Sequence, residues 1–172
     1  MNLLHVYTGE GKGKSTAAMG LACRMLGHDR PVIIIQFMKP GTSGELISLR
    51  KLGAIIYPAP AQKKFTFQMD EEELVQAGKE MKLAIDQMIE RIDEVKPALT
   101  VLDELATAMS FYLVPKVDGF RLIDAALKHG DVAVTGRGAG EDLFEKANYV
   151  SIIEARKHPF EEGISARKGI EW

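Results

Sequence analysis

The sequence predicts an α/β domain with a mostly parallel sheet and helices on both faces, and three observations support this fold class. Short, nearly continuous apolar runs alternate with helical patterns along the chain, and such runs are typical of strands buried on both faces. A length of 172 residues with 46% hydrophobic residues suits one domain with a substantial core. Polar and glycine-rich motifs follow several of the runs, where open α/β sheets bind ligands. We therefore expect a single domain over residues 1–172.

Four apolar runs are predicted to be strands because they are short and almost free of polar residues. The helical patterns between them imply crossover connections, which make neighbouring strands parallel. A last strand is expected near Tyr149–Glu154. The four runs are Leu3–Tyr7, Val32–Phe37, Leu99–Asp103 and Val132–Gly136.

Two helices are predicted with identifiable ends. The first runs from Lys14 to Gly27, because apolar residues recur on one face and glycine commonly ends a helix. The longest begins after Asp70, whose side chain can cap it, and Glu73 lies three residues on, as a capping box requires. Its apolar stripe is interpreted as a face that lies on the sheet. The stripe comprises Leu74, Ala77, Met81, Ala84, Ile85, Met88, Ile92 and Val95.

Three shorter helices complete the alternation, and they are expected around Glu104–Ser110, Val117–His129 and Glu141–Lys146. The segment Tyr57–Gln68 is interpreted as a long loop, because its prolines and polar residues interrupt any regular pattern.

Composition excludes several classes of partner. A formal net charge of −2 and a pI near 6.1 give no overall attraction to nucleic acid or to an anionic membrane. The one cysteine, Cys23, lies in an apolar helical pattern and is predicted to be a buried, inert thiol. The opening residues lack the features of a secretory signal, and no run approaches membrane-spanning length. We expect a soluble, cytoplasmic protein.

The stretch TGEGKGKSTAAMG, Thr8–Gly20, is typical of a phosphate-binding loop between a strand and a helix. It departs from the usual spacing by one residue, because Thr8 stands where the first glycine is expected and Gly9 comes one place late. Glycines at 9, 11 and 13 would let backbone N–H groups curl around phosphate oxygens, and the helix N-terminus adds positive potential. The loop therefore predicts a bound nucleotide.

Three side chains of the loop suit a triphosphate with a metal ion. Lys14 would place a cation on the phosphates, and Lys12 would add a second one. The hydroxyl of Ser15 would face Mg²⁺.

The acidic partner of this loop is predicted in LTVLDELATAM, where a strand ends in Asp103 and Glu104. A carboxylate there can hold Mg²⁺ directly or through water, opposite the Ser15 hydroxyl. Glu104 has two other interpretations, a residue that benefits from the dipole of the following helix and a general base for water. Metal coordination is favoured over both.

Further candidates follow two other strands. In VTGRGAG, the planar fork of Arg137 could reach a phosphate, although an exposed arginine in a polar loop is the alternative. In QFMKPGTSGE, the side chains of Gln36, Lys39 and Glu45 could also meet a ligand.

Taken in order, the loop, QFMK, LDEL, TGRG and the tail KHPFEEGISARKGIEW resemble the P-loop-type ATP:corrinoid adenosyltransferases, the CobA/BtuR family. The resemblance covers Thr8 to Trp172 and implies a P-loop NTPase-like, RecA-like fold. The family's loop is similarly shortened, with asparagine commonly at Glu10 and threonine at Ser15. The implied ATP ligands are Thr8, Gly9, Gly11, Lys12, Gly13, Lys14, Ser15, Thr16 and Arg137.

The resemblance also implies the chemistry. ATP lies in the loop in the reverse sense, and Co(I) of a reduced corrinoid displaces triphosphate from C5′ of the ribose, in the biosynthesis or salvage of adenosylcobalamin. No base is needed, because Co(I) carries no proton. Lys12, Lys14 and Arg137 are the implied catalytic cations, with a metal site of Ser15, Asp103 and Glu104.

On the corrinoid side, the family uses aromatic side chains to occupy the lower face of the ring. Phe65 and Phe67 are the matching residues, and Phe67 stands where close relatives carry tryptophan. The implied partners are a reductase that supplies electrons and a second copy in a homodimer. The tail signature matches at His158, Gly163, Gly169 and Ile170.

Two alternatives to adenosyl transfer remain open on the sequence. A phosphotransferase or ATPase would use the same loop for attack at the γ-phosphate. A non-catalytic protein would only bind nucleotide or corrinoid.

Overall fold

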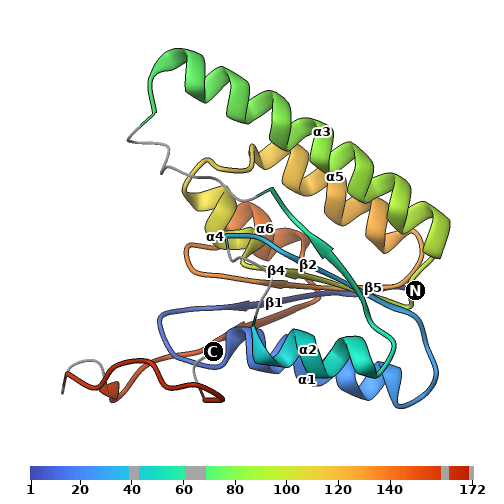
Figure 1. Cartoon of the computed structure of the whole chain (residues 1–172), viewed down its shortest axis with the longest axis vertical. Helices are drawn as coiled ribbons and strands as arrows, with labels where there is room; N and C mark the ends of the chain where they lie inside the picture. Colours follow the sequence, from blue (N-terminus) through green and yellow to red (C-terminus); the bar gives the residue numbers. More distant parts are fainter. Residues whose placement is uncertain (39–42, 61–68, 160–162, 171–172) are drawn as a thin grey trace.

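The computed structural model has a six-stranded parallel sheet between two layers of helices (Figure 1). It describes residues 1–38, 43–60, 69–159 and 163–170. The strand order is β3-β2-β4-β5-β1-β6. The strands are β1 (Leu4–Thr8), β2 (Val32–Gln36), β3 (Ile55–Pro58), β4 (Leu99–Asp103), β5 (Asp131–Thr135) and β6 (Tyr149–Ile152). The predicted fold class is thereby confirmed.

Helices cover both faces of the sheet (Figure 1). One layer holds α1 (Lys14–Leu26) and α2 (Gly44–Lys51). The other holds α3 (Glu71–Val95), α4 (Leu105–Ser110), α5 (Lys116–Leu127) and α6 (Glu141–Lys146). None of the helices in the described ranges is long and apolar enough to cross a membrane.

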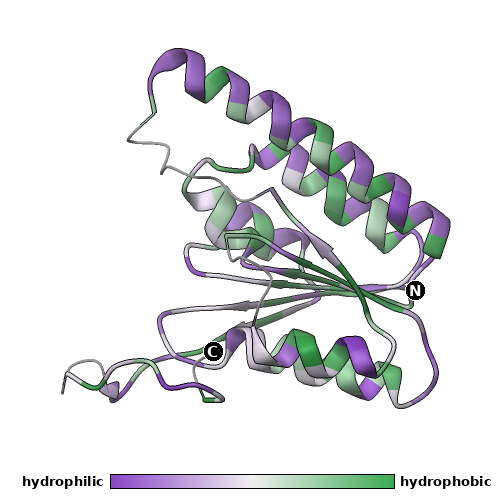
Figure 2. Ribbon diagram, viewed as in Figure 1, coloured by the Kyte–Doolittle hydropathy of each residue, from purple (hydrophilic) through white to green (hydrophobic). Residues whose placement is uncertain are grey.

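The central strands are apolar on both sides, as Figure 2 shows by their colour. Within β4, Val101 packs towards α1, whereas Leu102 faces the larger core beneath α3 and α5. This two-sided burial explains why the strands read as continuous apolar runs rather than as alternating patterns.

The capping box that begins α3 is present as predicted. The Asp70 carboxylate accepts a hydrogen bond from Glu73 N at 2.9 Å, and the Glu73 carboxylate accepts one from Asp70 N at 3.2 Å. The apolar stripe of α3 is buried only in part, because the first turns of the helix extend past the sheet (Figure 1). Met81, Ala84, Ile85, Met88 and Ile92 are buried, whereas Leu74 is 41% exposed.

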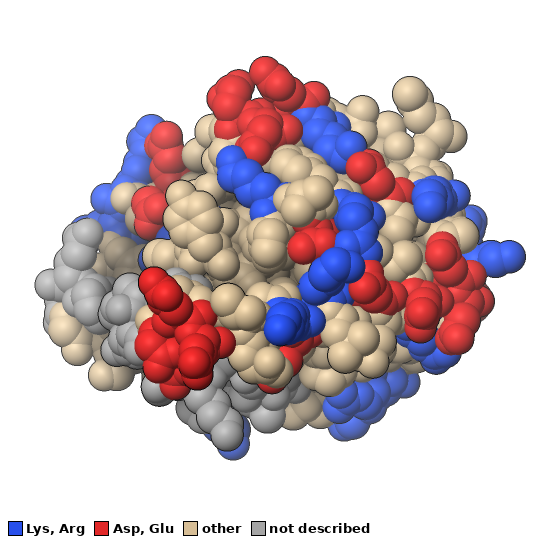
Figure 3. Space-filling view, turned by 90° about the horizontal axis from the view of Figure 1, so that it is seen from above, with Lys and Arg blue, Asp and Glu red and all other residues tan. Residues whose placement is uncertain are grey.

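The outer surface of α3 and α5 mixes positive and negative side chains (Figure 3). Arg121 on α5 binds Asp118 and reaches across to Asp86 on α3. The Arg121 guanidinium lowers the pKa of Asp86 below its ordinary value through this hydrogen bond. Neither sign of charge dominates this face, which agrees with the near-neutral composition.

Three details differ from the sequence predictions. Cys23 is exposed, so the prediction of a buried thiol is wrong: Ala22 is buried, but the next position turns about 100° around the helix to the solvent side. Neither α2 nor β3 was predicted. The expected loop from Tyr57 to Gln68 therefore begins too early, since Tyr57 belongs to β3, and residues 61–68 lie outside the described ranges.

Candidate active site at the carboxyl edge of the sheet

The loop between β1 and α1 is shaped by glycines that act in different ways. Gly13 has a positive φ of 120°, and an added Cβ there would meet no neighbouring atom within 4 Å. Its backbone conformation, not crowding, therefore requires glycine. Gly9 combines a φ of 99° with close packing, since an added Cβ would lie 2.5 Å from the Ile153 carbonyl oxygen. Gly11 N donates a hydrogen bond to the same oxygen at 2.7 Å. Thr8 is the last residue of β1 and is buried, so the loop begins at Gly9.

Lys14 folds back over the loop that it follows. Its Nζ donates hydrogen bonds to the carbonyl oxygens of Gly9 at 2.8 Å and Gly11 at 2.7 Å. These bonds place the ammonium at the centre of the loop, where a phosphate-binding lysine is needed.

Asp103 ends β4 as a fully buried carboxylate. It accepts hydrogen bonds from Gln36 Nε2 at 2.9 Å and from Thr135 Oγ1 at 2.7 Å. These partners end β2 and β5, the two strands that flank β4. The bonds offset the cost of burying the charge and join three strand ends into one polar unit.

Glu104 follows with a left-handed backbone, φ 61°, which is uncommon for a residue other than glycine. Its N–H donates to Thr135 Oγ1 at 2.9 Å, and its Oε2 accepts from Thr107 Oγ1 at 2.7 Å. Glu104 occupies the N-cap position of α4 without a side-chain capping bond. A carboxylate at this position lies close to the positive end of the helix dipole, so the dipole interpretation of Glu104 stays open beside metal coordination.

A cavity of about 460 Å³ lies between the loop, α4 and the end of β5, and we call it the central cavity. Lys14, Glu104 and Arg137 line it together with Thr107 and Phe111. Arg137 Nε lies 3.1 Å from Glu10 Oε2, with both side chains mostly exposed at 60% and 74%. Two cations and two carboxylates, those of Lys14, Arg137, Glu10 and Glu104, thus converge on one space.

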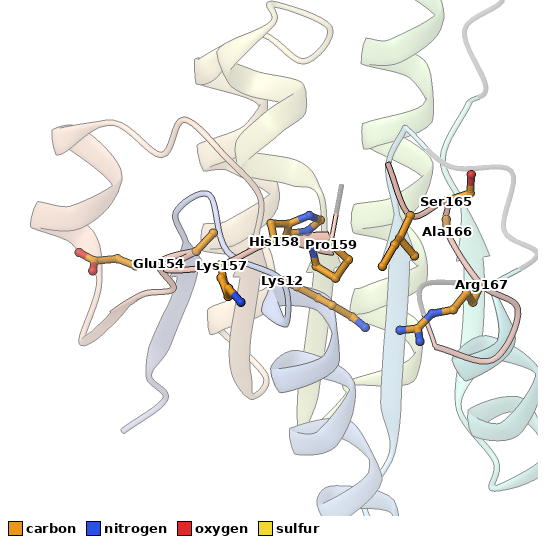
Figure 4. Close-up of a pocket in the computed structure, with 10 residues that line it drawn as sticks. Lys12, Glu154, Lys157, His158, Pro159, Ser165, Ala166 and Arg167 are labelled. Atoms are coloured by element: carbon orange, nitrogen blue, oxygen red, sulfur yellow. The ribbon is translucent and has the colours of Figure 1, made fainter. Parts of the chain in front are cut away.

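A second cavity of about 350 Å³ lies on the other side of the loop, and we call it the tail cavity (Figure 4). Lys12 lines it with Lys157, His158 and Arg167 from the C-terminal segment. In Figure 4, Lys12 and Arg167 point toward one another, and the Glu154 carboxylate points away from both. Basic groups therefore surround the loop on this side as well.

A model of the family described as ATP:corrinoid adenosyltransferase BtuR/CobO/CobP matches residues 1–172. The chain belongs to this family. It is 34% identical over 175 residues to a corrinoid adenosyltransferase of Pseudomonas aeruginosa, covering 99% of this chain and 83% of that protein. It is 32% identical over 180 residues to Corrinoid adenosyltransferase CobA of Salmonella typhimurium, with 99% and 85% covered. A corrinoid adenosyltransferase of a Sinorhizobium species is 32% identical over 173 residues, with 99% and 80% covered.

The protein is thus an enzyme, a corrinoid adenosyltransferase that transfers the adenosyl group of ATP to a corrinoid. Of the residues predicted for this reaction, the structure brings Lys14, Glu104 and Arg137 to the central cavity and Lys12 to the tail cavity. Gln36 does not line the central cavity but donates a hydrogen bond to the Asp103 carboxylate.

Other predicted residues of the adenosyltransferase are not among those that line the two cavities, or lie outside the described ranges. Thr16 is exposed on the first turn of α1, and Glu45 lies in the first turn of α2. Gly163, Gly169 and Ile170 are exposed in the tail. Lys39, Phe65 and Phe67 lie outside the described residues.

Sequence reasoning missed two threonines of the adenosyltransferase site. Thr135 and Thr107 hold the backbone and the carboxylate of Glu104, from a strand end and a helix interior. The only signal was position, since Thr135 precedes the glycine of VTGRG and Thr107 comes three residues after Glu104.

Proposed function

We propose that this adenosyltransferase binds ATP with its triphosphate over the phosphate loop, between the central cavity and the tail cavity. The observation that carries the proposal is the convergence of Lys14, Glu104 and Arg137 on the central cavity, directly above the loop. Lys12, on the far side of the loop, extends the positive surface along a polyanion.

The proposed reaction is a displacement at C5′ of the ribose. The electron pair of Co(I) forms the cobalt–carbon bond, the C5′–O bond breaks, and its electron pair leaves on the triphosphate. The protein's contribution is to hold the two substrates in line and to neutralise the charge that grows on the leaving group. Lys12, Lys14 and Arg137 are the cations proposed for that role, and no proton needs to be moved.

The oxygen groups at the site fit Mg²⁺, which prefers hard oxygen ligands and usually takes only one or two protein carboxylates beside the phosphates. Glu104 reaches the central cavity with Lys14, and Asp103 lies directly before it with each carboxylate oxygen already accepting one hydrogen bond. We propose that Ser15 and Glu104 hold Mg²⁺, with Asp103 behind them. The bound ion would offset triphosphate charge.

The corrinoid side of the proposal rests on the family resemblance. Phe65 and Phe67 are proposed to occupy the lower face of the corrinoid, which favours reduction to Co(I) by removing an axial ligand. A reductase is proposed as the electron donor, a homodimer as the working form, and the cytoplasm as the location of the enzyme.

Two variants test the assignment of the site. Lys14→Ala is expected to lower kcat/KM for ATP by about a hundred- to a thousandfold, the usual cost of losing a group that stabilises developing negative charge. Glu104→Gln is expected to raise the Mg²⁺ concentration for half-maximal rate by about ten- to a hundredfold. Lys79→Ala, an exposed change on α3, is the matched control and should leave both values unchanged.

The assay supplies chemically reduced corrinoid and ATP and measures adenosylated corrinoid. Near-normal turnover of Lys14→Ala at saturating ATP would rule out the proposed role of Lys14 in neutralising charge on the leaving triphosphate. An unchanged Mg²⁺ requirement in Glu104→Gln, with loss of an ATPase activity, would instead favour hydrolysis with Glu104 as base.

A further inference from the structure

We infer that Thr107 is a positioning residue that holds both Glu104 and Arg137 at the wall of the central cavity. The inference rests on the proposed roles of those two residues and assigns the group that sets their geometry. Thr107 is a helix residue, 8% exposed, with its hydroxyl at the cavity wall.

A single hydroxyl makes both contacts. Thr107 Oγ1 donates to Glu104 Oε2 at 2.7 Å and accepts from the N–H of Arg137 at 2.8 Å. The backbone N–H, the hydroxyl and the carboxylate therefore form a chain with one direction. Each bond in such a chain polarises the next, and the bond that ends on a charged oxygen is the strongest kind.

Glu104 is held at two points by this arrangement. Thr135 fixes its N–H, and Thr107 fixes one oxygen of its carboxylate. The left-handed backbone of Glu104 costs free energy that the surrounding bonds must offset. Without the Thr107 hydroxyl, the carboxylate would lose this hydrogen bond at the place where the metal and triphosphate are proposed to lie.

Arg137 is held through its backbone instead. The preceding Gly136 has a φ of 138° and approaches α4 so closely that an added Cβ would lie 2.5 Å from Thr107 N. The turn after β5 therefore rests on Thr107, and the Arg137 side chain leaves this fixed point toward the cavity. Valine at position 107 would keep the shape but leave this N–H and a Glu104 oxygen without their partner.

The test compares Thr107→Val, which removes the hydroxyl, with Thr107→Ser, which keeps it. Thr107→Val should lower kcat/KM for ATP by about ten- to a hundredfold, since it removes two hydrogen bonds and one of them is to a charged carboxylate. Thr107→Ser should stay within about threefold of the wild type. Thr100→Val is the matched control, because it removes the one buried hydroxyl in the described residues that has no hydrogen-bond partner. It should leave catalysis unchanged.

A second readout does not depend on turnover. ATP binding is titrated calorimetrically without corrinoid, once with Mg²⁺ and once with EDTA. In Thr107→Val, the gain in affinity that Mg²⁺ confers should shrink by about tenfold or more relative to the wild type and to Thr107→Ser. If valine prevents folding, Thr107→Ala takes its place in the same comparison.

A double-mutant cycle separates this inference from the proposal beneath it. The loss of activation free energy, taken from kcat/KM for ATP, should be smaller in the double variant Thr107→Val/Glu104→Gln than the sum of the losses in the two single variants. Both changes disrupt the same hydrogen-bonded unit. An equal loss of kcat/KM in Thr107→Ser and Thr107→Val would overturn the positioning role. Strictly additive losses in the double-mutant cycle would overturn it as well. If Glu104→Gln alone leaves Mg²⁺ dependence unchanged, the proposed role of Glu104 fails, whatever Thr107 does.

Discussion

Glu10 is the residue at which this chain departs most informatively from the family pattern. The resemblance of the loop implies an asparagine at this position, whereas here a carboxylate lines the central cavity and pairs with Arg137 Nε at 3.1 Å. A phosphate that approaches Arg137 meets a negative charge and has to displace it. The pair itself adds little to stability, because both side chains are mostly exposed.

We predict that Glu10→Asn lowers the KM for ATP by about two- to tenfold, since two like charges about 4 Å apart repel by about 1 kcal/mol in water and more at a protein surface. The melting temperature should hardly change. Steady-state kinetics at low and high ionic strength provide the measurement, and the gain should shrink with salt. A higher KM in Glu10→Asn would show that the carboxylate assists binding.

His5 gives the fold a dependence on pH that is independent of the active site. Its ring stacks on Tyr149 at 4.6 Å between centroids. Burial lowers the pKa of His5 below its ordinary value of 6.5, and the Asp131 carboxylate opposes that shift in part. Because the unfolded chain binds this proton more readily, the contribution to stability is fully present above the unfolded pKa. It is lost as the pH falls from there through the folded pKa.

We predict that the free energy of unfolding falls more steeply below pH 6.5 in the wild type than in His5→Phe, which keeps the stack but cannot titrate. Urea unfolding at a series of pH values between neutral and mildly acidic gives both curves. Parallel curves would show that His5 binds its proton equally in the two states.

Among the elements, α3 is the one whose two halves differ in what holds them. The half from Met81 onward is buried against the core, whereas the first turns have the capping box but little packing. Local hydrogen bonding and tertiary burial therefore stabilise different parts of one helix.

We predict that Asp70→Ala destabilises the first turns by about 0.5–2 kcal/mol while global stability changes much less. Faster amide hydrogen exchange confined to the start of α3 is the expected sign. By contrast, Ile85→Ala in the buried half should cost about 2–5 kcal/mol of global stability. A similar drop in global stability from Asp70→Ala would mean that the first turns are coupled to the core.

The elements that sequence reasoning found are those with a strong local cause. The strands at β2, β4 and β5 are continuous apolar runs, and α3 begins at a capping box. Both α2 and β3 lack such signals: only Leu46 and Leu49 of α2 are buried, and β3 is a short edge strand that ends in proline. Likewise, the phosphate loop was predicted from a local run of glycines and lysines between a strand and a helix. Thr107 was not predicted, since its bond to Arg137 joins residues 30 positions apart.

At the scale of the whole molecule, the site follows from the parallel sheet. Because every described strand runs in one direction, the ends of β1, β4 and β5 meet at a single edge, and their loops supply Lys14, Glu104 and Arg137. This edge is also where α/β sheets generally bind ligands. The arrangement alone would suit phosphoryl transfer as well as adenosyl transfer, so the bond that breaks in ATP distinguishes the two.

The most direct measurement is phosphorus NMR of one reaction mixture that contains the enzyme, ATP, Mg²⁺ and chemically reduced corrinoid. Cleavage of the C5′–O bond predicts that the ATP signals give way to those of free tripolyphosphate, in equal amount to the adenosylated corrinoid formed and only when corrinoid is present. Lys14→Ala should suppress both products together. ADP and inorganic phosphate that appear with or without corrinoid would contradict the account.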